Sequence, residues 1–372
     1  MRTLSIAALQ TAPVARDPDA TLESLAERVP AVKAAVPHAQ LLVLPELHLS
    51  AVPDLLDESD GYADSVAVTI PGALTDRLGE IARGTELWIV AGSVYERSDQ
   101  GGVHNTAVAV SPEGELAARY RKVFPWRPTE HSTPGDGFVT FDVPDVGRVG
   151  LAICYDGFFP EVIRQLAWLG AEVVIQPTLT TTSDREAELI AARANAIFNQ
   201  LYVVNVNAAQ PAALGRSVVV DPEGLVRVQA GEGEELLTDV LELESVERVR
   251  RFGLAGVSRM WEQLDSLDGA GPELPMYGGR IRPRPGVRRE GDWARRSLLF
   301  EPIPHQGLDS NGQREDLLQG LTPAMHHHFS ALPSTGEPRR ARSSQSDEGS
   351  PQWARFSTRC CGSITSEART ST

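Results

Sequence analysis

The chain has 372 residues, of which 41% are hydrophobic, and a net charge of −15 from 50 acidic and 35 basic residues. This length supplies one large α/β domain with an ample core and does not demand two domains. The acidic balance argues against nucleic acid or an anionic membrane surface as partner, because both select for clustered positive charge. A small neutral substrate is easier to reconcile with it.

The ends and the cysteines indicate a cellular compartment. No stretch approaches the roughly 18 consecutive apolar residues of a membrane span, and MRTLSIAALQ enters a strand-like run without signal-peptide features. Cys154 and an adjacent pair at 360–361 are too few for a disulfide framework. We therefore expect a cytoplasmic protein with no membrane partner, in which Cys154 is free and reduced.

Strand-like runs rich in Val and Ile alternate with amphipathic helical patterns, which predicts α/β layers. The predicted strands are 4–10, 40–46, 87–96, 104–111, 115–122, 148–155, 172–177, 201–208, 217–221 and 236–243, and the predicted helices are 19–36, 72–84, 160–170 and 184–200. SPEGEL (111–116) and DPEGLV (221–226) are near-copies of one strand–turn–strand hairpin. Two halves with internal pseudo-symmetry, or one common turn used twice, both explain this repeat.

The composition changes toward the C-terminus. We predict a catalytic domain at 1–262, a C-terminal arm at 263–289 and a disordered tail at 290–372, where Ser, Thr, Pro, Arg and Gly dominate without apolar period. Large apolar side chains between 253 and 282, Trp261 among them, predict packing of this region on a neighbouring subunit or within its own chain.

Three polar residues stand where apolar runs end. Glu46 closes QLLVLPE (40–46), Lys122 lies in ARYRKVFPW (118–126), and Cys154 lies in RVGLAICYDGFFPE (148–161). Strand ends are where open α/β sheets place their chemistry. Lys122 is one of only two lysines against 33 arginines, and a compact ammonium fits beside an oxyanion where a forked guanidinium does not. We interpret the three as base (Glu46), electrophilic stabiliser (Lys122) and nucleophile (Cys154).

Further residues are candidates for the same site. Glu130 lies eight residues beyond Lys122 and is predicted to hold that lysine or to accept a hydrogen bond from a substrate amide, unless it is an ordinary loop glutamate. His48 and His131 are possible pocket residues, although no Cys–His signature is evident. Taken alone, Cys154 also fits a small apolar residue that finishes a buried strand.

The motifs PEL (45–47), YRKVFPW…E (120–130) and ICYDGFFPE (153–161) resemble the three signature regions of the nitrilase superfamily of carbon–nitrogen hydrolases, over about residues 1–262. The resemblance implies an α/β fold built as a four-layer αββα sandwich, assembled as a homodimer or higher homo-oligomer. It implies no metal and no organic cofactor. It also implies that Trp126 and Tyr155 wall an acyl pocket, although either is equally well explained as core.

The motif details resemble the aliphatic amidase and formamidase branch, in which the lysine is followed by a Pro-Trp pair (Pro125-Trp126 here) and a second glutamate. Nitrilases usually carry Cys-Trp-Glu where this chain has Cys-Tyr-Asp (154–156), and N-carbamoyl-amino-acid hydrolases usually place arginines after the cysteine, where this chain has Gly-Phe-Phe (157–159). The resemblance therefore implies hydrolysis of a small neutral amide through a cysteine thioester. The alternatives are a nitrilase or N-carbamoyl-amino-acid hydrolase with the same triad, and an inactive amide-binding protein. LHLS (47–50) after the glutamate departs from the amidase pattern and leaves the size of the pocket open.

Overall fold

The computed structural model describes residues 1–52, 61–265, 272–277 and 279–280. The predicted tail at 290–372 and much of the predicted arm at 263–289 lie outside these ranges. Within them, no helix combines the length and hydrophobicity needed to cross a bilayer.

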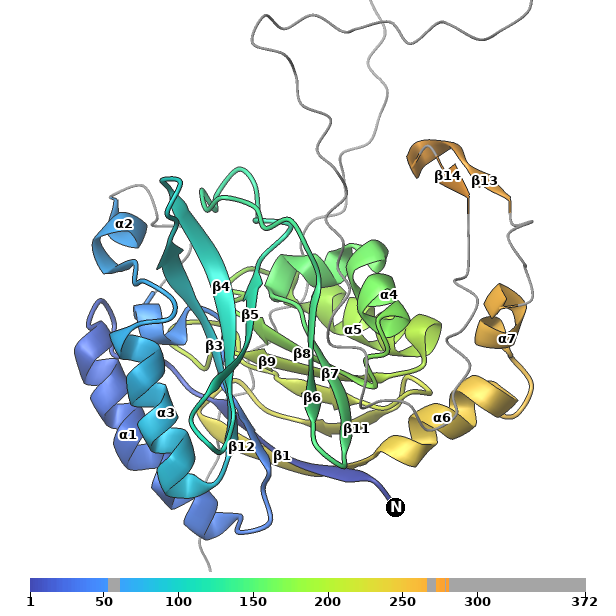
Figure 1. Ribbon diagram of the computed structural model, residues 1–372, viewed down its shortest axis with the longest axis horizontal. Helices are drawn as coiled ribbons and strands as arrows, with labels where there is room; N and C mark the ends of the chain where they lie inside the picture. The colour runs from blue at the N-terminus through green and yellow to red at the C-terminus, as the bar shows by residue number, and fades with distance from the viewer. Residues whose placement is uncertain (53–60, 266–271, 278, 281–372) are drawn as a thin grey trace, which may run out of the picture. The chain divides into compact units, whose positions relative to one another are not determined.

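The first sheet has six strands in the order β12-β1-β2-β3-β4-β5 (Figure 1). Its strands are β1 (Thr3–Gln10), β2 (Leu41–Val43), β3 (Trp88–Arg97), β4 (Val103–Val110), β5 (Leu116–Arg121) and β12 (Glu235–Glu242). The β1–β2 and β2–β3 pairs are parallel, and the pairs toward both edges are antiparallel.

The second sheet also has six strands, in the order β11-β10-β9-β8-β7-β6. Its strands are β6 (Val139–Val143), β7 (Gly147–Leu151), β8 (Val173–Thr178), β9 (Tyr202–Asn207), β10 (Val218–Val220) and β11 (Val226–Gln229). The pairs β7–β8 and β8–β9 are parallel, and the remaining pairs are antiparallel.

The two sheets repeat one plan. Strands β1 to β5 of the first sheet and strands β7 to β11 of the second follow the same spatial order, with the same parallel and antiparallel pairs. Each sheet has one further antiparallel strand, β12 beside β1 in the first sheet and β6 beside β7 in the second. The near-copies at 111–116 and 221–226 supply the β4–β5 and β10–β11 turns, at equivalent edges of the two sheets. The topology thus favours the pseudo-symmetric explanation of the sequence repeat.

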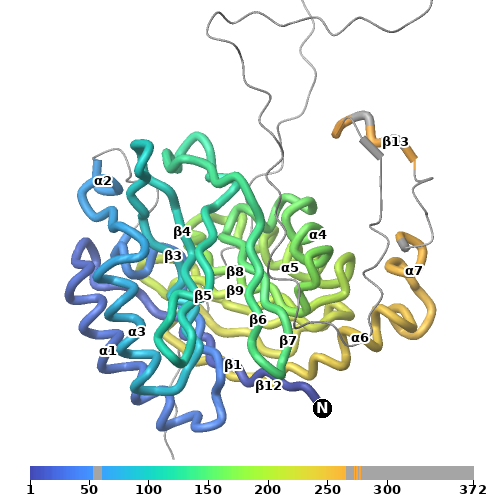
Figure 2. The backbone as a smooth tube through the Cα atoms, in the orientation of Figure 1, coloured from blue at the N-terminus to red at the C-terminus, as the bar shows by residue number. Residues whose placement is uncertain are grey.

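Four helices cover the outer faces of the sheets and create the αββα layering (Figures 1 and 2). Helices α1 (Pro18–Ala35) and α3 (Ala73–Thr85) pack on the first sheet, and α4 (Pro160–Trp168) and α5 (Arg185–Asn199) pack on the second. The largest apolar cluster lies between the sheets and takes side chains from both, such as Ile6, Val43, Val149 and Ile175. The four-layer sandwich predicted from the sequence is therefore confirmed.

Local sequence explains where the elements begin and end. Asp17 caps α1 by accepting a hydrogen bond from the Ala20 N–H at 2.9 Å, and Pro18 occupies the first helical position, where no N–H is needed. The central parallel strands are buried on both faces and read as continuous apolar runs. The expected strands at 40–46 and 148–155 end early, at Val43 and Leu151, because the chain leaves the sheets there to form the turns of the site.

Several short elements lacked a sequence prediction. These are β6, β11, α2 (Tyr62–Val66), α6 (Leu243–Phe252), α7 (Met260–Asp265) and a small hairpin of β13 (Glu273–Leu274) and β14 (Gly279–Arg280). Most of them are short or lie at edges, where apolar periodicity is weak. Helix α6 is the exception, because its buried Leu243, Val246 and Val249 recur at helical spacing.

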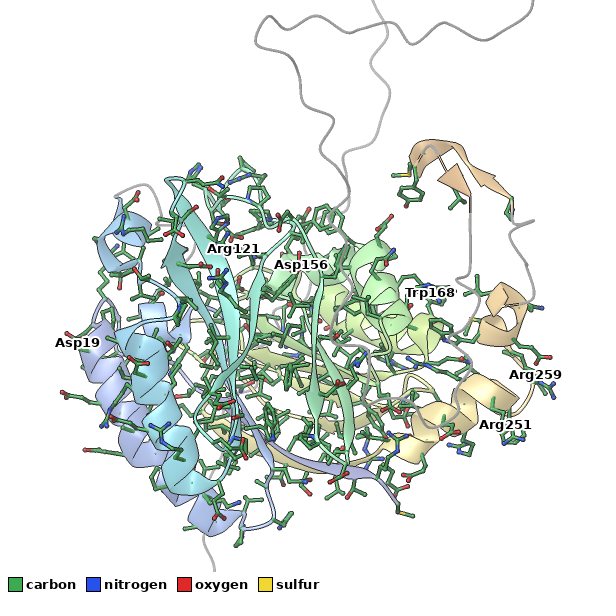
Figure 3. All side chains as sticks on the ribbon, viewed as in Figure 1. Asp19, Arg121, Asp156, Trp168, Arg251 and Arg259 are labelled. Atoms are coloured by element: carbon green, nitrogen blue, oxygen red, sulfur yellow. The ribbon has the colours of Figure 1, made fainter. Side chains whose placement is uncertain are left out.

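Trp261 on α7 packs within its own chain. Its ring stacks on Trp168 at 5.4 Å between centroids, and its indole N–H donates to the Asn199 carbonyl at 3.2 Å (Figure 3 labels Trp168). Met276 and Tyr277 are by contrast 85% and 56% exposed. The intrachain alternative therefore holds for the tryptophan.

Candidate active site

The candidate residues lie where the two sheets meet. Glu46 follows β2, Lys122 follows β5, and Cys154 opens the short 3₁₀ turn Cys154–Phe158 after β7. The Glu46 N–H donates to the carbonyl of Thr178, the last residue of β8, at 3.3 Å. This contact joins a strand end of the first sheet to one of the second.

A buried cluster of three charges forms the floor of the site. The Lys122 ammonium lies 2.9 Å from Glu46 Oε1 and 2.6 Å from Glu130 Oε2, and all three side chains are essentially inaccessible to solvent. The amide of Asn105 on β4 bridges the carboxylates, donating to Glu46 Oε1 at 2.8 Å and to Glu130 Oε1 at 3.0 Å. One ammonium thus holds two carboxylates that would otherwise repel each other.

All four acceptor positions of Glu130 are filled. Besides Lys122 and Asn105, it accepts from the Trp126 N–H at 2.9 Å and from the Ser132 hydroxyl at 2.8 Å. Although Glu130 lies in the loop between β5 and β6, it is buried and its acceptors are occupied, so the geometry favours lysine-holding over acceptance from a substrate. Glu46 differs, because its Oε2 is buried without a hydrogen-bond partner.

The charge states follow from burial and proximity. Burial alone would lower the pKa of Lys122, but Glu130 and Glu46 outweigh it and raise that pKa well above its ordinary value. Burial opposes ionisation of Glu130, yet Lys122 lowers its pKa. For Glu46, burial prevails over Lys122 and the pKa is raised. The cluster thus contains an ammonium, a carboxylate that pairs with it, and a second carboxyl group suited to exchange a proton.

Cys154 sits on a strained turn. Its φ of 44° is in the left-handed region that side-chain-bearing residues rarely adopt. The Gln176 amide donates to the Cys154 carbonyl at 2.8 Å and holds this conformation. Burial, followed by the charge of Glu46, raises the pKa of the thiol well above its ordinary value, so the resting sulfur is protonated.

Asp156 (labelled in Figure 3) connects the turn of Cys154 to the segment around Lys122 by hydrogen bonds. It is fully buried and accepts from the Ile153 N–H at 3.0 Å, the Tyr120 hydroxyl at 2.8 Å and the Phe124 N–H at 2.9 Å. Burial raises the pKa of Asp156 to about 6. Its three donors fix the position of Cys154 relative to the segment that follows Lys122.

Above the sulfur is a small cavity of about 20 Å³. It is lined by Trp126, Cys154, Tyr155, Phe158, Leu179, Thr180, Thr181, Thr182 and Asp184. None of these lining residues is basic. The Asp184 carboxylate accepts from the Thr182 hydroxyl rather than capping α5.

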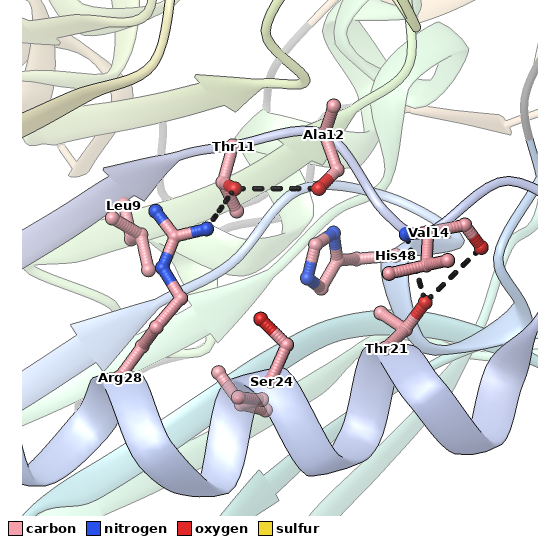
Figure 4. Close-up of a pocket in the computed structure, with 9 residues that line it drawn as sticks. Leu9, Thr11, Ala12, Val14, Thr21, Ser24, Arg28 and His48 are labelled. Atoms are coloured by element: carbon pink, nitrogen blue, oxygen red, sulfur yellow. Dashed lines mark hydrogen bonds between the residues drawn. The ribbon is translucent and has the colours of Figure 1, made fainter.

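The predicted pocket residues separate into two groups. Trp126 and Tyr155 line the cavity over Cys154, whereas His131 is exposed and is not among its lining residues. His48 is buried in a different cavity, between Thr11 at the end of β1 and Ser24 on α1 (Figure 4). Burial lowers the pKa of His48 to about 4, so it is neutral there. The structure thus supports a pocket role for the two aromatic residues and gives none to the histidines.

Sequence reasoning missed Asn105, Asp156, Thr180 and Glu188 as parts of the site. The position of Asp156, two residues after the cysteine, was the available signal for that residue, and an Asn inside the strand run HNTAVAV was the signal for Asn105. Across the described ranges, no group of three or more His, Cys, Asp or Glu side chains is placed to hold a metal ion.

Comparison with known proteins identifies the class. Residues 5–251 match the model of the carbon–nitrogen hydrolase family. The chain belongs to this family, and its two six-stranded sheets are those of nitrilase-superfamily structures.

Individual relatives are more distant. Formamidases of Bacillus thuringiensis (strain Al Hakam) and Bacillus anthracis are each 33% identical over 195 residues, which is 52% of this chain and 57% of the relative. The chain thus spans little more than half the length of the curated relatives it matches.

Similar solved structures cover a larger share of this chain than the formamidases do. Nit3 of Saccharomyces cerevisiae, a member of branch 10 of the nitrilase superfamily, is similar over 67% of this chain and 94% of its own, with 28% identity and a TM-score of 0.62. An amidase from Nesterenkonia sp. is similar over the same shares, with 27% identity and a TM-score of 0.54.

Proposed function

We propose that this carbon–nitrogen hydrolase converts a small, uncharged carboxamide to a carboxylic acid and ammonia through a thioester on Cys154. The observation that carries the proposal is the buried Glu46–Lys122–Glu130 cluster beneath a strained cysteine that opens on a small cavity. Such a cluster is costly to bury unless it has a chemical task.

The first half-reaction uses each group once. Glu46 Oε2, which has no other partner, takes the Cys154 proton as the sulfur attacks the amide carbonyl. The Lys122 ammonium and the Tyr155 backbone N–H stabilise the oxygen that becomes negative. Glu46 then gives its proton to the amide nitrogen, the C–N bond breaks and ammonia leaves.

The second half-reaction regenerates the enzyme. Glu46 takes a proton from water, whose oxygen attacks the thioester carbonyl, and the sulfur leaves and recovers its proton. Glu130 keeps Lys122 in place throughout. A parallel supports the choice of a cysteine nucleophile: in a glutamate-to-glutamine mutant of the Nesterenkonia amidase, the acetamide moiety of fluoroacetamide is added covalently at the active-site cysteine.

The substrate class is argued from the cavity. The cavity above Cys154 is small, at about 20 Å³, which favours a short acyl group over a long one. Because the lining residues include Asp184 and no basic residue, a substrate carboxylate would meet a like charge without a counterion. This favours neutral amides over N-carbamoyl amino acids. The related formamidases and the Nesterenkonia amidase in complex with butyramide are consistent with that choice.

The test is ammonia release from formamide, acetamide, propionamide, glutamine, a short aliphatic nitrile and N-carbamoylglycine. We expect turnover of the short neutral amides, with kcat/KM at least about tenfold above that for N-carbamoylglycine. Asp184→Asn should narrow this gap, while Asp19→Asn on the exposed surface of α1 should not. Turnover of the nitrile or the carbamoyl compound alone would reject the amide assignment.

We further propose that the chain forms a homo-oligomer through the outer face of α5. Ile190 and Phe198 on this helix are 62% and 51% exposed, and Leu225 in the β10–β11 turn is 60% exposed. Phe198→Glu should lower the mass measured by light scattering, whereas Val257→Glu, also at an exposed apolar residue, should leave it unchanged. An unchanged mass in both variants would reject this interface.

A further inference from the structure

A hydrogen-bond chain leads from the Cys154 sulfur into the second sheet's helical layer. Thr180, just beyond β8, places its hydroxyl 3.9 Å from Cys154 Sγ and 2.5 Å from Glu188 Oε2. Glu188 lies in the first turn of α5 and is only 2% exposed. Neither Thr180 nor Glu188 has a task in the proposed half-reactions.

Glu188 is held as a carboxylate by a fixed arginine. Arg185 donates to Glu188 Oε2 at 2.7 Å, and its other nitrogens donate to the carbonyls of Gly215 at 3.1 Å and Arg216 at 2.8 Å. The Asn205 amide donates to Glu188 Oε1 at 3.1 Å. A guanidinium has only donors, so the Glu188 oxygens that Arg185 and Asn205 contact act as hydrogen-bond acceptors.

The protons in this chain can then be assigned. A threonine hydroxyl has one proton, and the ionised Glu188 can only accept, so Thr180 donates to Glu188. Thr180 therefore presents lone pairs to the sulfur, and only a protonated Cys154 can complete the contact. A thiolate would instead be repelled by the lone pairs of the Thr180 hydroxyl and by the buried charge of Glu188 beyond it.

We propose that Thr180 and Glu188 form a pair that keeps Cys154 as a thiol between turnovers, with Glu188 acting as a positioning residue through the threonine hydroxyl. The S–H proton then leaves only when Glu46 accepts it as the carbon–sulfur bond forms. Thr180 and Glu188 gain and lose no proton in that step. The resting sulfur is thereby kept out of the thiolate form that oxidants attack.

The test is the pH dependence of thiol modification by methyl methanethiosulfonate, a small reagent that is not an amide. The full chain carries Cys360→Ser and Cys361→Ser, so that only Cys154 reacts. Glu188→Gln removes the buried charge behind Thr180. Because Glu188 Oε2 accepts from both Thr180 and Arg185, the glutamine oxygen is expected to keep that position, so the change tests the charge itself. In Glu188→Gln, we expect the midpoint of the pH dependence of Cys154 modification to fall by at least about one pH unit relative to the parent chain. The rate of modification at neutral pH should rise about tenfold.

Two further variants keep the result interpretable. Thr180→Ser retains the hydroxyl and should keep the wild-type profile. If Glu188→Gln fails to fold because Arg185 loses its partner, Arg185→Gln with Glu188→Gln removes both buried charges and should shift the midpoint in the same direction. An unchanged or higher midpoint in the folded variant, or an equal shift in Thr180→Ser, would overturn the proposal. The link between this pair and catalysis rests on the proposed function, but the titration of Cys154 needs no turnover. A failure of the amide-hydrolysis proposal would therefore appear separately, as an absence of ammonia release.

Discussion

Replacing Lys122 by methionine tests the charge cluster most directly. Methionine has a similar length but no charge, so Glu46 and Glu130 lose the ammonium that lies 2.9 and 2.6 Å from them. Removal of one partner from a buried ion pair costs about 3–5 kcal/mol. A typical domain has about 5–15 kcal/mol of stability, so we expect a folded but weakened protein. One oxyanion donor is also lost, which should lower kcat by about 10²–10³-fold or more.

The loss should depend on pH with a defined sign. Without Lys122, burial raises the folded-state pKa of both carboxyl groups above their unfolded values. Such a group contributes stability that is fully present below its unfolded pKa and is lost as the pH rises through the folded pKa. Each proton involved changes the free energy of unfolding by up to about 1.4 kcal/mol per pH unit. The free energy of unfolding of Lys122→Met should therefore be closer to that of the wild type at about pH 5.5 than at about pH 8.

Urea unfolding at both pH values measures these differences. Lys33→Met is the matched control, because Lys33 is the other lysine and its ammonium donates to the Ala39 carbonyl, at 2.9 Å; we expect it to cost at most about 1 kcal/mol. The double change Lys122→Met with Glu130→Gln should recover part of the loss. Two results would refute the reasoning. One is a Lys122→Met protein as stable as the wild type at pH 8, and the other is a larger loss of stability, relative to the wild type, at pH 5.5 than at pH 8.

Three further outcomes are expected. Cys154→Ala should abolish ammonia release while changing the free energy of unfolding by no more than about 1 kcal/mol; retention of a tenth of wild-type activity would reject the nucleophile. Hydroxylamine added during turnover should trap the acyl group as a hydroxamate, detected by mass spectrometry, and its absence would favour direct attack by water. Asp156→Asn should cost about 2–4 kcal/mol in urea unfolding, because the Ile153 and Phe124 N–H groups donate to different oxygens of Asp156 and the asparagine can keep only one of these acceptors; an unaltered stability would show that the donor left over finds another acceptor.

The fold could be predicted well from the sequence because its signals are local. Long buried strands read as apolar runs, Pro71-Gly72 precedes α3 directly, and Pro160 opens α4. The predicted ends of two strands were wrong for one shared reason. After β2 and β7 the chain turns away to aim Glu46 and Cys154, and the left-handed φ of Cys154 leaves no mark in hydropathy.

The site was predictable only in part, because its partners come from distant segments. Glu46, Lys122 and Cys154 stand at ends of apolar runs, but Asn105 reaches Glu46 across 59 positions of the chain and Glu188 reaches Cys154 only through Thr180. What such residues share is a local conflict: an amide or carboxylate lies where burial would favour an apolar side chain. Asn105, the second residue of HNTAVAV (104–110), is fully buried on β4 and shows this conflict. Burial of a polar side chain costs free energy unless its polar groups form hydrogen bonds. The Asn105 amide donates to Glu46 and Glu130, the two carboxylates that share Lys122. A polar residue inside a predicted strand is therefore a sequence signal for a supporting residue such as Asn105, whereas strand ends indicate the residues predicted to react.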